Sequence, residues 1–256
     1  MRFTFACLLA CALGCTRSSF APQDAGARPV SAFSAAPSVA AAQTAGTARL
    51  EGRVQWQGPR PVLAPLPTSP SAQSVCGASV ADNALQVEAD GGVLEAVVWV
   101  DAPAEALSPG GPGPAALIDQ RGCLYWPAVL AARAGGTLRI RNSDPLTHTV
   151  HAFDEGLSLF NLAMPLAHME LSRQLPLQPG VVEFRCDVHP WMRAVLRTFA
   201  HSHYTTTGPG GRFQLPGLPP GDYVLHVWHP KLGEASRRLQ VGVGAATADF
   251  EFGGMK

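Results

Sequence analysis

The sequence predicts an all-β protein built from antiparallel sandwiches. Its 256 residues include 26 glycines and 23 prolines, which indicates many turns. Apolar residues make up 46% of the chain. They fall in short runs, and several runs alternate with polar residues, as in Leu138, Ile140 and then Asn142. Short alternating runs between regular turn signals, without helical periodicity, are typical of sandwiches.

Several segments carry this strand pattern. They are residues 50–56, 93–100, 137–141, 147–152, 181–185, 193–199, 212–215, 222–228, 238–243 and 248–252. A short helix is expected near residues 127–132.

The chain begins with the features of an export signal. Arg2 provides a minimal basic start, and residues 3–13 form an apolar run of the usual signal-peptide length. A bilayer-spanning helix needs about 20 apolar residues, so this run is too short to be one. The run ends at Leu-Gly-Cys15, which resembles a bacterial lipobox with Cys15 as the lipidated residue. A competing lipobox ends at Cys11, and an ordinary cleaved signal peptide also fits.

We therefore expect a lipoprotein signal peptide over residues 1–15. Residues 16–47 are rich in Ala, Ser and Pro and are expected to form a disordered tether. Thr16, not Asp, follows Cys15. By analogy with Gram-negative sorting, this favours a periplasmic or cell-envelope protein at the outer membrane, with the lipid as its only membrane anchor.

The cysteines are also consistent with an exported protein. Of six cysteines, three lie in the signal region, which leaves Cys76, Cys123 and Cys186. An exported protein lives in an oxidising compartment, where two of these can pair. Because Cys186 belongs to the metal-ligand pattern described next, Cys76 and Cys123 are the expected disulfide. Two buried free thiols are the alternative.

An apolar strand at 181–185 runs into the pattern Cys186-x-x-His189-x-x-Met192. Thiolate, imidazole and thioether ligands select copper over magnesium, calcium or manganese. A His₂Cys set with a weak axial Met needs one more histidine from a neighbouring strand. His148 opens such a strand after a Ser-Asp-Pro turn, and the stretch from there to Cys186 has room for two further strands. The predicted copper ligands are thus His148, Cys186, His189 and Met192.

Other metal centres fit the sequence less well. A structural zinc site would need a fuller tetrahedral set of Cys and His. A c-type haem would need Cys-x-x-Cys-His, which is absent.

The ligand pattern resembles the cupredoxins, the type 1 (blue) copper proteins, and the loop Cys-x-x-His-Pro-x-Met is most similar to that of amicyanin. In that family the first histidine lies in Pro-His-Asn-Val-His, and residues 147–151 here read THTVH. This places His148 at the ligand position and His151 on the opposite strand face. Residues 118–142 look like the opening strands. Many cupredoxins have Asn where this chain has Thr149, whose hydroxyl makes fewer hydrogen bonds.

A second resemblance lies near the C-terminus. Residues 211–225 (GRFQLPGLPPGDYVL) look like the core of the carboxypeptidase regulatory-like β-sandwich. Segments that look like the opening strands of that module lie far upstream, at 52–54 and 96–100. We expect an outer sandwich from residues 48–105 and 201–252, with a cupredoxin-like Greek-key domain at 115–200 inserted into it. Two domains in simple tandem are the alternative. Proteins loosely labelled methylamine utilisation proteins share this combination.

The resemblance implies an exported copper-binding protein that transfers single electrons to a redox partner protein and is not an enzyme. His189 would be a partly exposed electron port framed by Pro165, Pro190 and Trp191. One alternative is copper binding or delivery without redox turnover. Another is a structural module whose regulatory-like sandwich binds a surface partner. No small-molecule substrate is implied.

Composition and missing motifs disfavour other classes. Formal net charge is zero, with no basic patch for nucleic acid. The motif G-x-S-x-G is absent, which disfavours a hydrolase. A multicopper oxidase needs more histidine clusters than the single His-x-His at His201 and His203. These two, His226, His229 and His168 are candidates for a second metal site, although loop or core positions are more usual.

Overall fold

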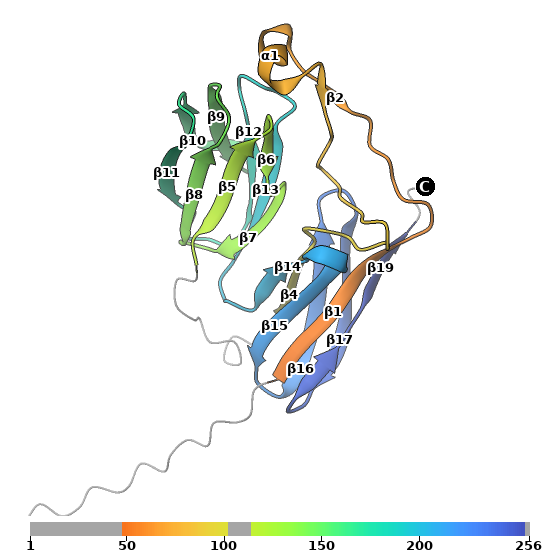
Figure 1. Ribbon diagram of the computed structural model, residues 1–256. Coiled ribbons are helices and arrows are strands. Elements are labelled where there is room, and N and C mark those ends of the chain that lie inside the picture. Colours follow the sequence, from red (N-terminus) through yellow and green to blue (C-terminus); the bar gives the residue numbers. More distant parts are fainter. Residues whose placement is uncertain (1–47, 102–113, 254–256) are drawn as a thin grey trace, which may run out of the picture. The chain divides into compact units, whose positions relative to one another are not determined.

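The computed structural model describes residues 48–101 and 114–253 (Figure 1). The expected signal peptide, its lipidation site and the tether lie outside these residues. Nearly all regular structure is strand, which confirms the all-β class. The strands are β1 (Ala48–Gln57), β2 (Leu66–Pro67), β3 (Ser79–Val80), β4 (Val97–Asp101), β5 (Ala116–Arg121), β6 (Leu124–Trp126), β7 (Val129–Arg133), β8 (Thr137–Asn142), β9 (His148–Asp154), β10 (Leu157–Met164), β11 (Met169–Gln174), β12 (Val181–Arg185), β13 (Arg193–Phe199), β14 (Tyr204–Thr206), β15 (Arg212–Leu218), β16 (Gly221–His229), β17 (Gly233–Val241), β18 (Ala245–Thr247) and β19 (Phe250–Gly253).

In residues 48–101 and 114–253, helical structure is confined to short pieces. The helix α1 spans Gln73–Cys76, and 3₁₀ turns occur at Pro70–Ala72 and Pro209–Gly211. Within the described ranges, no helix has the length and apolar character needed to cross a bilayer.

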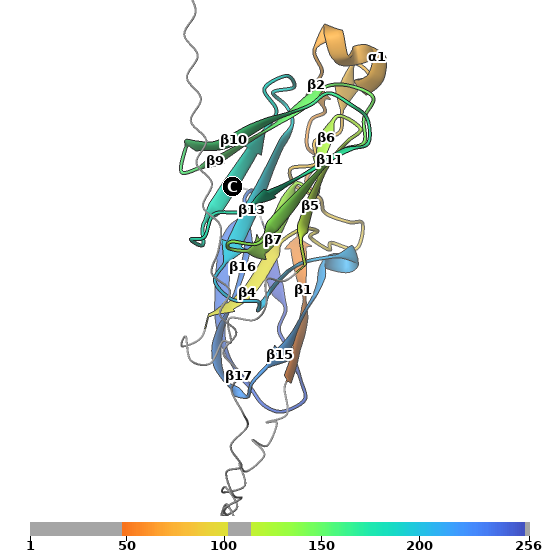
Figure 2. The same ribbon diagram turned by 90° about the vertical axis from the view of Figure 1, so that its left-hand side faces the viewer.

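Strands β5 to β13 form one sandwich, which we call the inner sandwich. One sheet has the order β10-β9-β12-β13-β7 and the other β11-β8-β5-β6 (Figure 1). Figure 2 shows the same strands after a turn of 90°. Side chains from both sheets form one buried core, including Ile118, Leu138, Val150, Phe184 and Leu196. Cys186 and Met192 belong to the same core, so the packing of the sandwich holds the predicted copper loop in place.

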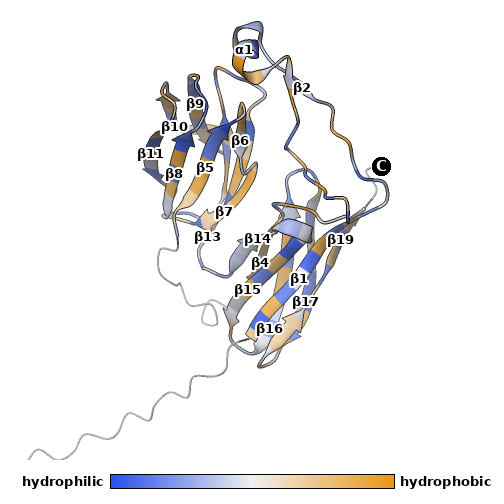
Figure 3. Cartoon of the chain, viewed as in Figure 1, coloured by the Kyte–Doolittle hydropathy of each residue, from blue (hydrophilic) through white to orange (hydrophobic). Residues whose placement is uncertain are grey.

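Alternation of side chains accounts for this core. In β12, Val182 and Phe184 are buried and their neighbours are exposed. Figure 3 shows bands of alternating hydropathy along β1 and β15. Strands β10 and β11 were not among the expected segments. Most of their side chains are partly or fully exposed, so the alternation that marks a half-buried strand is faint there.

The helix expected near residues 127–132 is wrong. Val129–Arg133 is the edge strand β7, which pairs in parallel with β13 from Val129 opposite Val195 to Arg133 opposite Phe199. This pairing gives the backbone the hydrogen-bond partners that buried peptide groups require. An apolar run this short does not distinguish helix from strand by periodicity alone.

The remaining strands, apart from the short pair β2 and β3, form a second sandwich, the outer sandwich. It comprises β1, β4 and β14 to β19. β1 pairs with β15, β18 and β19, and β4 pairs with β14 and β16. Its core is separate and includes Leu50, Val54, Val98, Leu215 and Leu225. The domain boundaries and the regulatory-like identity stay predictions.

Residues 66–80, which we call the strap, lie between β1 and β4 in the chain and are joined to the inner sandwich by a disulfide. The strap carries β2, α1 and β3, and its Cys76 forms a disulfide with Cys123 of the inner sandwich. Val80 of the strap, Cys123 and Leu124 form a small buried cluster, against which Trp191 and Leu146 pack. A segment far upstream in sequence thus reaches the end of the inner sandwich that carries the ligand loops.

Candidate metal centre

Strand pairing brings the predicted ligand segments together. β12 lies between β9 and β13, with Arg185 opposite His151 on one side and opposite Arg193 on the other. His148 opens β9, and Cys186 follows β12 immediately. The loop from Cys186 to Met192 then joins two antiparallel neighbours. The amide of Met192 donates to the carbonyl of His189 at 2.9 Å, which makes the loop a tight turn.

Three of the four predicted ligands form a compact group. The donor atoms of His148, Cys186 and His189 all lie within 4.8 Å of one another, and all three residues are buried. Nδ1 of His189 lies 3.7 Å from Sγ of Cys186 and 2.8 Å from Nδ1 of His148. Two donors about 2.0–2.3 Å from one first-row metal ion lie about 3.5–4 Å apart in a trigonal set. The sulfur–nitrogen distance fits this spacing, and the two nitrogens are at hydrogen-bonding distance.

The donor set suits copper chemically. One thiolate and two imidazoles form the trigonal group of blue-copper sites, in which the fourth ligand is a weak, long axial thioether. Met192 is fully buried and packs in the same core cluster as Cys186. The site therefore combines soft sulfur with imidazole, and no carboxylate belongs to the group of donor atoms.

His148 is oriented by a carboxylate. Its Nε2 lies 2.9 Å from Oδ2 of Asp144, and Asp144 is itself almost fully buried. An ionised carboxylate only accepts hydrogen bonds, so Nε2 carries a proton and Nδ1 of the neutral ring is left to bind a metal. Burial lowers the pKa of His148, but the hydrogen bonds to Asp144 and Cys186 outweigh it and the pKa is raised.

Cys186 is surrounded by hydrogen-bond donors. The amide of Thr149 lies 3.3 Å from its sulfur, and the Thr149 hydroxyl lies 3.8 Å away. Burial raises the pKa of the thiol, but the interactions with His148 and with the Thr149 amide outweigh it, so the pKa is lowered. The surroundings thus favour the thiolate, which is the form that binds metal.

Thr149 also links the two ligand segments. Its hydroxyl accepts a hydrogen bond from the amide of Asp187 at 2.7 Å, directly after Cys186. Thr149, at the position where many cupredoxins have asparagine, therefore still connects the two ligand segments. His151 points away from the donors, toward Asp187 and Ser158, as the alternation along β9 predicts.

The expected exposure of His189 is wrong. Its relative exposure is only 3%. Its ring lies 5.0 Å from the ring of Trp191, measured between centroids, and Trp191 packs against the buried cluster formed by Val80 of the strap with Cys123 and Leu124. The sequence near His189 contains no sign of this packing, because the strap comes from far upstream.

Two of the histidines considered for a second metal site, His226 and His229, have partners of their own. His226 stacks on Trp99 with 4.8 Å between ring centroids and lies 3.0 Å from both Asp101 and Glu234. Burial lowers the pKa of His229 to about 4, and its Nδ1 accepts the amide of Lys231 at 3.2 Å. Among the residues that the structure describes, only His148, Cys186 and His189 form a group suited to hold a metal ion.

Known proteins resemble this chain only in part. No protein-family model matches it, and no curated protein does. A purple cupredoxin from Nitrosopumilus maritimus is 24% identical over 33% of this chain and 99% of that protein, with a TM-score of 0.29. A copper(I) amicyanin variant is 20% identical over 39% of this chain and 98% of that protein, with a TM-score of 0.30.

A copper-containing nitrite reductase from Thermus scotoductus is 20% identical over 40% of this chain but only 25% of the enzyme, also with a TM-score of 0.30. Similarity at this level does not assign a ligand, so the metal is inferred from the donor atoms themselves.

Sequence reasoning missed the supports of the site. Asp144 lay in the turn before His148, and a carboxylate so close to a candidate ligand was the available signal. No such sequence signal pointed to Cys123, whose backbone groups hydrogen-bond to Asp144 and Trp191. Hydrogen bonds made by backbone groups leave no trace in residue type.

Proposed function

We propose that this protein is an exported type 1 copper protein that carries single electrons. The observation that carries the proposal is the buried convergence of one cysteine and two histidines from two adjacent segments of a β-sandwich, the start of β9 and the loop between β12 and β13. Bound by these side chains, with Met192 as a weak fourth ligand, copper would supply a one-electron couple.

The chain's own residues support such a role by resisting rearrangement. Cys186 and Met192 are packed in the sandwich core. Asp144 holds the ring of His148, and Thr149 holds the start of the Cys186 loop. A donor set fixed in this way changes little between two metal oxidation states, which favours rapid electron exchange over substrate chemistry.

Partner and location belong to the same proposal. Two exposed apolar side chains adjoin the ligand segments, namely Val188 at 48% exposure and Leu166 at 66%. An apolar rim of this kind suits a small, transient contact with a redox protein. The Cys76–Cys123 disulfide supports an oxidising compartment such as the periplasm or cell envelope. We do not assign an enzymatic activity or a small-molecule substrate.

Copper loading of the purified protein tests the proposal. One equivalent of Cu(II) should give an intense visible thiolate-to-copper absorption, the narrow copper hyperfine splitting of type 1 sites, and a reversible one-electron wave. Cys186→Ser should abolish the absorption because it removes the thiolate. His203→Gln, which changes a histidine outside the donor group, is the matched control and should keep it.

Two results would contradict electron transfer. A protein that binds no copper would instead be a structural or surface-binding module. A protein that binds copper but lacks a reversible wave, and exchanges the ion readily, would be a copper-delivery protein.

A further inference from the structure

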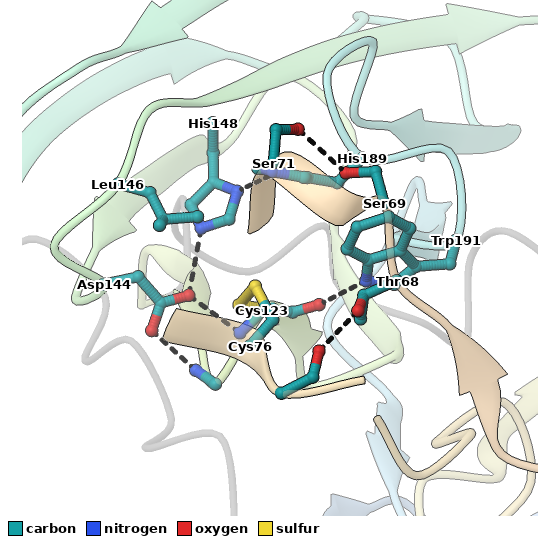
Figure 4. Close-up of a disulfide and its surroundings, with 12 residues drawn as sticks. Thr68, Ser69, Ser71, Cys76, Cys123, Asp144, Leu146, His148, His189 and Trp191 are labelled. Carbon is teal, nitrogen blue, oxygen red and sulfur yellow. Dashed lines mark hydrogen bonds and ion pairs between the residues drawn. A yellow bond between two sulfur atoms is a disulfide. The ribbon is translucent and has the colours of Figure 1, made fainter. Parts of the chain in front are cut away.

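Cys123 makes three connections at once. Its sulfur is bonded to Cys76 of the strap. Its amide donates to Oδ2 of Asp144 at 2.8 Å, and its carbonyl accepts Nε1–H of Trp191 at 2.9 Å. Figure 4 shows these contacts around the disulfide, with His148 and His189 beside them. One residue outside the donor group therefore contacts the supports of both ligand histidines.

The first branch runs through Asp144 to His148. Oδ1 of Asp144 accepts the amide of Gly122 at 2.7 Å. Oδ2 accepts the amide of Cys123 and also faces Nε2 of His148 at 2.9 Å. Both carboxylate oxygens are thus occupied by N–H donors. The turn at Gly122 and Cys123 fixes the carboxylate, and the carboxylate fixes the ring.

The backbone of this turn is unusual. It connects β5 and β6, with Arg121 opposite Leu124, so Gly122 and Cys123 are its two central residues. Both have positive φ, +60° and +61°. Such a turn favours Gly or Asn at both positions, yet a buried Cys occupies the second. The disulfide and the hydrogen bonds of Cys123 hold it in a conformation that its residue type disfavours.

The second branch runs through Trp191 to His189. Trp191 lies between His189 and Met192 in the ligand loop, and its ring is close to that of His189. Its indole N–H is directed to the carbonyl of Cys123. The same ring packs against the cluster formed by Val80 of the strap with Cys123 of the turn and Leu124, so the strap and the turn together constrain the position of the loop.

We propose that the disulfide-bonded turn at Gly122–Cys123 positions the metal centre, holding His148 through Asp144 and His189 through Trp191. The identity of the metal rests on the proposed function, but the positioning itself does not. It predicts that the metal-free protein already holds His148 as the Nε2–H tautomer. It also predicts that breaking the disulfide disturbs both histidines, although neither cysteine is a ligand.

Three variants test the two branches. Asp144→Asn places an NH₂ where one carboxylate oxygen accepts an N–H, so at least one of the three hydrogen bonds must be lost. Trp191→Phe keeps an aromatic ring, although a smaller one, and removes the indole N–H donor. The pair Cys76→Ser with Cys123→Ser removes the covalent anchor. For each variant, ring ¹⁵N NMR of the metal-free protein reports the His148 tautomer. Copper titration and voltammetry report affinity and reduction potential.

Loss of such a supporting residue typically weakens metal binding 10–100-fold, and we expect this range for Asp144→Asn. The double serine variant should mix the His148 tautomers, weaken copper binding and shift the potential. When Asp144→Asn is added to the double serine variant, copper affinity should fall by less than the product of the two separate fold-losses, because both changes act on the His148 ring. Val54→Ala, in the separate core of the outer sandwich, is the control for lost stability and should leave tautomer and potential unchanged.

The proposal is overturned if the double serine variant folds and keeps the wild-type tautomer, copper affinity and potential. If the double serine variant does not fold, Asp144→Asn and Trp191→Phe test the proposal instead. A wild-type His148 tautomer and a wild-type reduction potential in both of these variants would also overturn it. Failure of the wild-type protein to bind copper would instead refute the proposed function, while the tautomer of the metal-free protein would still test the positioning.

Discussion

Single residues tune the centre by the hydrogen bonds they make to its sulfur. Thr149 contributes twice, through its amide at 3.3 Å from Cys186 Sγ and its hydroxyl at 3.8 Å. Hydrogen bonds to the cysteine sulfur of a blue-copper site raise or lower its reduction potential. A donor to the sulfur stabilises its negative charge and therefore favours the reduced metal, which carries one positive charge less.

Thr149→Val should lower the reduction potential of the copper-loaded protein. The substitution removes the hydroxyl but keeps the amide, so part of the stabilisation remains. It should also cost about 1 kcal/mol of folding free energy, because the amide of Asp187 loses its acceptor. Voltammetry and urea unfolding measure the two effects. Thr149→Ser, which keeps the hydroxyl, is the control, and an unchanged or higher potential in the valine variant would contradict the expectation.

At the scale of elements, turns decide which strands can meet. The loop between β12 and β13 brings Cys186 and His189 together within a few residues of chain. The turn before β15 has a different task, since it lets β15 pair with β1. There Gly211 has φ +68°, and a side chain on it would meet the carbonyl oxygen of Val54 at 2.2 Å.

Gly211→Ala should therefore destabilise the outer sandwich by at least about 2 kcal/mol, from the left-handed backbone and the clash together. Urea unfolding measures the loss. Gly208→Ala in the same turn is a matched control, because nothing lies within 4 Å of its added carbon. The copper spectrum of folded Gly211→Ala should match wild type, and equal stability of the two variants would show that the turn tolerates a side chain.

Two large hydrophobic cores organise the part of the chain that the structure describes. One belongs to the outer sandwich and the other to the inner sandwich. The chain leaves the outer sandwich after β4 and returns at β14, and these strands are antiparallel neighbours with Trp99 opposite Tyr204. Strands in that relation can be joined by a short hairpin turn.

Replacing residues 102–203 by a short Gly-containing turn, together with Cys76→Ser, should leave a folded outer sandwich that binds no copper. It should be less stable than the full chain, since Val97 and Trp99 lose contacts with Val129 and Phe199. Circular dichroism, urea unfolding and copper titration check this. An unfolded product would mean that the outer strands need the inserted region, and would count against the nested arrangement that the sequence predicts.

Local spacing explains how much of the site was predictable. Cys186, His189 and Met192 fall within one tight turn, so their residue types alone indicate the chemistry. His148 could be assigned because it opens the strand after the turn and matches the ligand position of the motif that the chain resembles. Alternation then places His151 on the opposite face, which is less buried. The strap, the turn at Cys123 and the carboxylate of Asp144 were not predictable in this way. Their roles depend on contacts between segments far apart in the chain.

The sequence alone therefore determined the all-β class and the donor types, because both follow from period and spacing over a few residues. Tertiary structure decided whether those residues are buried and what supports them. His189 is enclosed, not exposed, and residues 129–133 are a strand, not a helix. In both cases a partner comes from elsewhere in the chain, the ring of His148 for His189 and β13 for β7. Burial and strand pairing are properties of such distant contacts, which no local pattern records.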